Sequence, residues 1–81
     1  MYKVDQEKWN RFPPQVQLRH IAVELTRATQ AGLREGEEER KWVSEAYERA
    51  LSLVDACLDD PQWENRELLY QLRDAIAALY V

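Results

Sequence analysis

The chain holds few side chains whose type and spacing could support chemistry, and the first is its single histidine, His20. A histidine acts as a general acid–base group or as a phosphoryl acceptor when a neighbouring group orients its ring. Glu24 follows four residues later, one helical turn away, and is the candidate orienting group. The same spacing is typical of an ordinary His–Glu pair on a helix surface, which is the interpretation we favour.

The cysteine and the carboxylates form no catalytic or metal-binding pattern. Cys57 falls among apolar residues at helical spacing, which predicts a small buried side chain and not a nucleophile. Helical metal sites use Glu-x-x-His pairs, and calcium loops use a fixed carboxylate spacing around a glycine; the sequence has neither. We therefore expect no catalytic residue, metal, cofactor or small-molecule substrate.

The charge balance bears on the classes of partner. Eleven Lys and Arg against 15 Asp and Glu give a formal net charge of −4, with the arginines spread along the chain. Nucleic acids and anionic membranes bind clustered cations, so both are disfavoured as partners. One cysteine rules out an intramolecular disulfide framework and fits a reducing compartment. Without a signal-peptide pattern or a bilayer-spanning apolar run, the expected location is cytoplasmic.

Helices must position His20, Glu24 and Cys57. The longest helical pattern in the sequence covers residues 37–59. Its apolar residues occupy about half of the helix circumference, so this helix should contact two neighbours at once. They are Trp42, Val43, Ala46, Tyr47, Ala50, Leu51, Leu53, Val54, Cys57 and Leu58. Gly36 is the expected N-cap. Glu37–Glu39 would lie in the first turn, where negative charge meets the helix dipole; a docking patch for a basic partner is the alternative.

A second helix is predicted over 14–31, because Pro13 and Pro14 mark its start. Its core stripe comprises Leu18, Ile21, Ala22, Leu25, Ala28 and Thr29. Gly32 is expected to end this helix in the left-handed conformation, with Leu33 folding back as a hydrophobic cap.

A third helix is predicted over 61–80. Asp60 as N-cap and Pro61 at the first helical position form its start signal. Its core stripe comprises Leu68, Leu69, Leu72, Ala75, Ile76 and Leu79. A continuous helix from Pro61 would turn Trp63 and Tyr70 away from that stripe.

Residues 1–12 read as an N-terminal arm. Asp5 is expected to cap a short helical turn through Gln6–Arg11, which is stable only if Trp9 and Phe12 dock on the bundle. In an up-down-up arrangement the arm would arrive near Trp63, and Trp42 would lie near Tyr80. Whether the arm covers both Trp63 and Tyr70 stays open.

These patterns predict one all-α domain of 81 residues, an antiparallel three-helix bundle with a short N-terminal arm or helical turn. The alternative architecture is a helical hairpin completed by dimerisation.

The functional hypothesis follows from side chains that lie outside the core stripes. These candidate partner contacts are Val16, His20, Val23, Arg27, Trp63 and Tyr70. Aromatic residues with nearby arginines are typical of protein interfaces. We therefore predict a non-enzymatic protein–protein interaction module that self-associates, with a homodimer or a hetero-protein partner. The alternative is a small histidine-dependent phosphotransfer or regulatory protein that uses His20.

Overall fold

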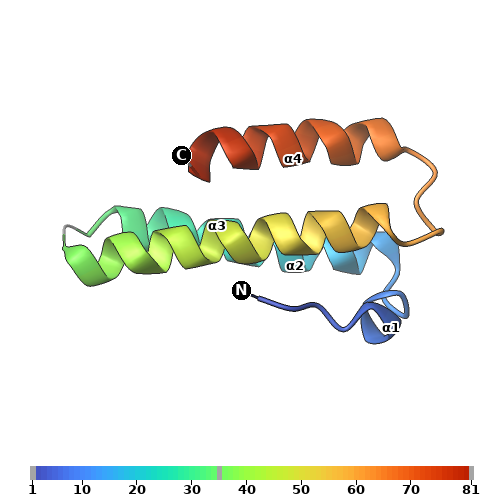
Figure 1. The fold of residues 1–81 in the computed structure, drawn as a ribbon, viewed down its shortest axis with the longest axis horizontal. Helices are drawn as coiled ribbons and strands as arrows, with labels where there is room; N and C mark the ends of the chain where they lie inside the picture. The colour runs from blue at the N-terminus through green and yellow to red at the C-terminus, as the bar shows by residue number, and fades with distance from the viewer. Residues whose placement is uncertain (1, 35, 81) are drawn as a thin grey trace.

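Four helices make up the computed structural model, which describes residues 2–34 and 36–80, the side chain of Tyr80 excepted. They are α1 (Gln6–Trp9), α2 (Pro14–Gly32), α3 (Glu37–Leu58) and α4 (Arg66–Tyr80), and the described residues contain no strand. The predicted all-α fold with three main antiparallel helices is confirmed (Figure 1).

Helix α3 lies at the centre of the arrangement. It packs against both α2 and α4, whereas α2 and α4 barely approach each other. Figure 1 shows α2 and α3 as an overlapping antiparallel pair, with α4 along one side and the arm that carries α1 along the other. The expectation that residues 37–59 contact two helices is thus confirmed, since a half-circumference apolar stripe cannot be buried by one neighbour.

The core is built around α3. Its buried side chains come from every element: Trp9 of α1, Ile21 of α2, Leu69 and Ile76 of α4, and Ala50, Leu53, Val54, Ala56 and Cys57 of α3. Full burial of each larger side chain contributes about 1.5–3 kcal/mol. The arm is therefore an integral part of the core, as the docking of Trp9 required.

The α2–α3 connection agrees only partly with the sequence patterns. Gly36 is the N-cap of α3, and Glu37–Glu39 lie in its first turn, as predicted. The prediction of a left-handed Gly32 is wrong, because α2 includes Gly32 and no described glycine adopts the left-handed conformation. Leu33 continues in right-handed geometry, its N–H bonded to Ala31 and Gln30 carbonyls, and it is 82% exposed instead of capping the helix.

Trp42 was placed on the core stripe of the central helix, and this is wrong because it is 46% exposed. It lies at the edge of the wide stripe, near the bundle end that the shorter α4 does not reach (Figure 1). Its expected neighbour, the Tyr80 side chain, lies outside the described residues.

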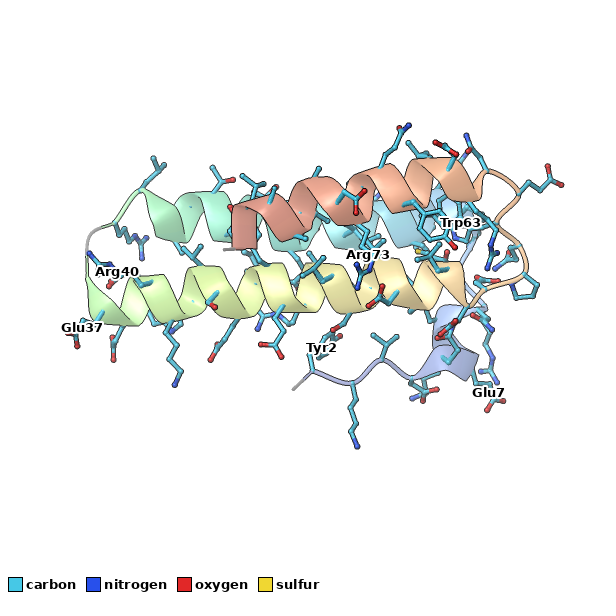
Figure 2. All side chains as sticks on the ribbon, turned by 45° about the horizontal axis from the view of Figure 1, so that its top comes forward. Tyr2, Glu7, Glu37, Arg40, Trp63 and Arg73 are labelled. Carbon is cyan, nitrogen blue, oxygen red and sulfur yellow. The ribbon has the colours of Figure 1, made fainter. Side chains whose placement is uncertain are left out.

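The third main helix begins at Arg66, so the predicted start at Pro61 is wrong. The Asp60 side chain accepts the backbone N–H of Gln62, which makes a turn in place of a helix start. Asn65 Oδ1 then accepts the Leu68 N–H at 3.2 Å and caps α4. Residues 60–65 are a connecting loop, and Trp63 can turn inward from it (Figure 2).

Candidate functional site

A buried polar junction fastens the arm to the bundle, with Gln17 of α2 at its centre. The Gln17 amide Nε2 donates to the Trp9 carbonyl at 2.9 Å and to Asp60 Oδ2 at 2.7 Å. Its Oε1 accepts the Trp63 indole N–H at 2.5 Å and the Cys57 thiol at 3.6 Å. The buried amide therefore uses its full hydrogen-bonding capacity in structural contacts.

Asp60 is the charged member of this junction and is fully buried. Burial alone raises the pKa of a carboxyl group. Hydrogen bonds from the Gln62 backbone N–H and from the Gln17 and Gln62 side chains outweigh it and lower the Asp60 pKa. Gln62 Nε2 also donates to the Asn10 and Phe12 carbonyls at 2.8 and 3.1 Å, which ties the loop to the arm.

The lowered Asp60 pKa predicts that acid destabilises the fold. A carboxylate with a lower pKa when folded contributes stability above its unfolded pKa of about 3.9, and this is lost as the pH falls through the folded pKa. Urea unfolding at pH 7 and pH 3 measures the loss. The Asp60→Asn protein should have a lower free energy of unfolding at pH 7 than the unmodified protein. Its free energy of unfolding should also fall less between pH 7 and pH 3. Equal losses in the two proteins would contradict the assignment to Asp60.

Cys57 is buried in the same junction, as its core position predicted. Burial raises the pKa of its thiol to about 11, and the nearby Asp60 charge adds to the shift. The thiol is consequently neutral at pH 7, whereas a nucleophilic cysteine needs an accessible thiolate. The Trp9 indole N–H is buried without a hydrogen-bond partner among the described residues.

His20 belongs to an aromatic cluster between the arm and α2. Its ring lies 5.1 Å from Phe12 and 5.9 Å from Trp9, measured between centroids. Glu24, the expected orienting group, instead bonds Arg27 at 3.1 Å and Arg49 of α3 at 2.9 Å. The carboxylate thus joins α2 to α3 and does not orient the imidazole.

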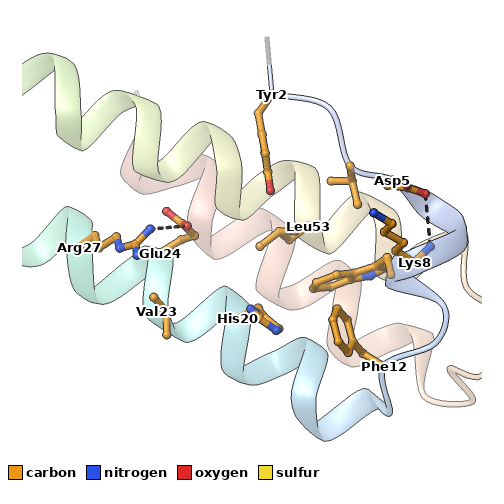
Figure 3. Close-up of a pocket in the computed structure, with 11 residues that line it drawn as sticks. Tyr2, Asp5, Lys8, Phe12, His20, Val23, Glu24, Arg27 and Leu53 are labelled. Atoms are coloured by element: carbon orange, nitrogen blue, oxygen red, sulfur yellow. Dashed lines mark hydrogen bonds and ion pairs between the residues drawn. The ribbon is translucent and has the colours of Figure 1, made fainter.

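A cavity of about 290 Å³ lies beside this cluster, under the arm (Figure 3). It brings His20, Val23 and Arg27 together with Lys8 and Tyr2 of the arm, so three predicted contacts share one wall. Val16 is half-buried and lies outside that lining. Arg27 is already paired with Glu24, and the cavity carries charges of both signs, so its lining selects no ligand class.

The other two predicted contacts lie apart from this cluster. Trp63 is 8% exposed, so the expectation that it faces away from the core is wrong; the loop before α4 allows it to reach Gln17. Tyr70 is 54% exposed on α4, as expected. The arm therefore covers the Trp63 region and leaves Tyr70 open to solvent.

The sequence patterns do not predict an apolar surface that lies between α2 and α4. We call it the α2–α4 face. It comprises Leu18, Ala22, Leu25 and Thr29 of α2, with Leu68, Leu72, Ala75 and Leu79 of α4. Glu24 bonds α3 on the arm side of α2, and Arg73 reaches Asp55 of α3 from one flank of α4 (Figure 2). Helical spacing puts the α2–α4 face on the opposite flanks.

These eight residues had all been assigned to core stripes. Leu68 and Leu79 are nevertheless 43% and 61% exposed, Ala22, Thr29 and Ala75 are also exposed, and the other three are half-buried. The reason is that α4 packs on α3 and not on α2. The helical spacing of apolar residues identifies an apolar stripe on each helix. It does not show how much of that stripe a neighbouring helix covers, so this face becomes evident only from the packing of the helices.

A larger hollow of about 780 Å³ adjoins the face where α4 ends. Val43 and Tyr47 of α3 and Leu79 of α4 supply apolar lining, and its charged lining residues are Arg34, Glu39 and Arg40. The 15-residue α4 is shorter than the 22-residue α3, which leaves this end of the hairpin without a third helix.

The described residues also bear on two other classes of site. No group of three or more His, Cys, Asp or Glu side chains there is arranged to hold a metal ion. No helix within residues 2–34 and 36–80 is long and apolar enough to cross a membrane. Comparison of the chain with protein-family models, with curated proteins and with solved structures finds no match.

Proposed function

We propose that this chain is a non-enzymatic protein–protein interaction module that self-associates through the α2–α4 face. The observation that carries the proposal is the chemistry of that face. None of its eight residues is charged, in a chain in which 32% of residues are. Depletion of charge at the centre of a contact surface distinguishes interfaces from ordinary protein surface.

Exposure of the larger side chains supports the same conclusion. Leu68 and Leu79 of α4 leave much of their surface in water, and Leu18, Leu25 and Leu72 are only half-buried. A contiguous apolar patch on a small domain is typical of an interaction site, whereas single exposed apolar residues are ordinary. Burial of this face would add the hydrophobic stabilisation that a chain of 81 residues lacks.

The histidine-dependent alternative gains no support from the geometry. Glu24 is engaged by two arginines and His20 is packed on Phe12, so the ring lacks the orienting carboxylate that acid–base or phosphotransfer chemistry requires. A cytoplasmic location remains part of the proposal and rests on the single, unpaired cysteine.

Light scattering over a concentration series should show a dimer whose population rises with protein concentration. Leu79→Glu places a charge in the α2–α4 face and should weaken association by more than about 30-fold, the effect of a 2 kcal/mol hot spot. Leu33→Glu is the matched control, because Leu33 is also highly exposed but lies in the α2–α3 turn. It should leave the dissociation constant almost unchanged.

A monomer at every concentration would overturn self-association. Equal effects of Leu79→Glu and Leu33→Glu would show that the α2–α4 face is not the interface. Val23→Glu and Tyr70→Glu test two further exposed apolar positions, one beside the arm and one on α4. Disruption by either of these, with no effect of Leu79→Glu, would move the interface to that surface.

A further inference from the structure

We infer that a second surface of this chain binds a short acidic peptide segment of a partner protein, through three arginines and Trp42. The surface is a hollow of about 240 Å³ between α2 and α3, which we call the arginine hollow. Its lining comprises Arg27, Gln30, Ala31 and Arg34 of α2, with Trp42, Ala46 and Arg49 of α3. Arg27 and Arg34 share the flank of α2 that carries Glu24, opposite to the α2–α4 face, so the inference goes beyond the proposed self-association.

The size of the arginine hollow suits the side chains of a peptide. Ala31 and Ala46 are the small residues of its lining and leave room between the larger side chains. Its volume lies below the roughly 300–1,000 Å³ that is typical of small-molecule sites. Trp42, the aromatic residue of the lining, is 46% exposed. An exposed indole beside arginines is typical of the residues that contribute most to binding in protein complexes.

The charge of the arginine hollow favours an anionic ligand. Its lining has three arginines and no acidic residue. Glu24 lies next to it with only 12% of its side chain exposed, and its two oxygens bond Arg27 at 3.1 Å and Arg49 at 2.9 Å (Figure 3). Arg34 has no ion pair among the described residues. One carboxylate therefore faces three guanidinium groups, and the local charge is positive in a chain of net charge −4.

Two acidic residues of α3 flank Trp42 along the helix but do not line the arginine hollow. Glu45 lines a different hollow, together with Tyr2 and Glu48. Glu38 lies one turn before Trp42 and forms no ion pair among the described residues. Because both lie on α3, an anionic ligand would approach from the α2 side.

The paired arginines retain hydrogen-bond donors for a ligand. Arg27 bonds Glu24 through Nη1, and Arg49 bonds it through Nε. A guanidinium group carries five N–H donors, so each of these side chains keeps others. The forked arrangement of those donors matches the two oxygens of a carboxylate.

The spacing of the arginines indicates how the carboxylates of the peptide would be placed. Arg27 and Arg34 are two helical turns apart, which is about 10 Å along α2. In the polyproline II conformation, residues three apart lie on the same edge, about 9 Å from each other. A segment such as Asp-Pro-Pro-Asp would thus offer one carboxylate to each arginine. Its prolines would pack on Trp42, as proline-rich segments do on aromatic side chains.

Nuclear magnetic resonance of the tryptophan indoles tests the inference with the synthetic peptide acetyl-Gly-Asp-Pro-Pro-Asp-Gly-amide. The indole N–H signal of Trp42, assigned with Trp42→Phe, should shift during the titration. Those of Trp9 and Trp63, which are 5% and 8% exposed, should stay in place. Arg34→Gln should weaken binding about ten-fold, as expected for the loss of a charged hydrogen-bond partner.

Arg19→Gln is the matched control, because Arg19 is an exposed arginine of α2 outside the arginine hollow. It should change the dissociation constant by less than about two-fold, since solvent and salt screen exposed charges. Equal weakening by Arg34→Gln and Arg19→Gln would overturn the inference by showing that overall charge, and not the hollow, attracts the peptide.

Three other results would also contradict the inference. The first is the lack of any Trp42 shift at about 5 mM peptide, a concentration that fills even a millimolar site. The second is an equal shift with a peptide that has Lys in place of both Asp residues. The third is tighter binding of a short single-stranded thymidylate oligomer, which would assign the arginine hollow to nucleic-acid phosphates.

Discussion

Replacing Gln17 by Leu is expected to destabilise the protein by about 2–4 kcal/mol, although the side chains have similar volumes. The substitution leaves the Trp63 N–H without an acceptor. Asp60 Oδ2 and the Trp9 carbonyl each lose one of two donors, since Gln62 Nε2 still bonds Asp60 and the Phe12 N–H still bonds the carbonyl. Each buried polar group left unpaired costs about 1–3 kcal/mol. A loss of this size is a large fraction of the 5–15 kcal/mol that is typical of folded domains.

Urea denaturation followed by circular dichroism measures this effect. Gln15→Leu is the matched control, because Gln15 lies on the same helix, two residues earlier, with its side chain exposed. It should change the free energy of unfolding by less than about 0.5 kcal/mol. If Gln17→Leu were no more destabilising than Gln15→Leu, the hydrogen bonds of the junction would contribute nothing to stability.

Trp9→Ala is expected to remove the arm from the bundle and to cost about 3–5 kcal/mol. Trp9 is buried against the core, whereas α1 has only four residues and cannot persist alone. Loss of this anchor should also expose Gln17 and Trp63 to water, since the Trp9 carbonyl is one of the junction's partners. Helices α2, α3 and α4 should keep most of their helical signal.

Limited trypsin digestion and hydrogen exchange locate the change. Cleavage after Lys3, Lys8 and Arg11 should accelerate in the Trp9→Ala protein, and exchange should rise most strongly across residues 2–12. Phe12→Ala provides the comparison. Phe12 also touches His20 but is largely exposed, so its truncation should cost about 1 kcal/mol. Equal protection of the arm in both variants would show that Trp9 does not anchor it.

Helices and their broad packing were predictable because they depend on local signals. The Asp5 cap, the Pro14 start and the Gly36 cap each act on the residues beside them, and all three occur as predicted. Asp60 shows where such signals fail. Its side chain was read as a helix cap, but burial beside Gln17 and Gln62 commits it to a turn, and this depends on residues 43 positions apart.

The polar junction and the α2–α4 face were not predictable for related reasons. The residues next to Gln17 in the sequence give no sign of its buried role. Its four hydrogen-bond partners come from three other parts of the chain, which only the fold brings together. The helical spacing of Leu68 and Leu79 predicts core positions, but both side chains are exposed. The spacing carries no information on which helices α4 packs against, and α4 packs against α3. Both features arise from the relative placement of helices.

The arm's attachment also bears on the order in which the chain can fold during synthesis. Gln6 bonds the Ala56 carbonyl, 50 residues away, and Gln62 bonds the Asn10 carbonyl, 52 residues away. The α2–α3 hairpin needs only nearby contacts and can form as soon as both of its helices have left the ribosome, before α4 has emerged. The arm, although it is synthesised before the helices on which it packs, is therefore among the last segments to reach its final position. Until then, the polar amide of Gln17 faces water in the growing chain.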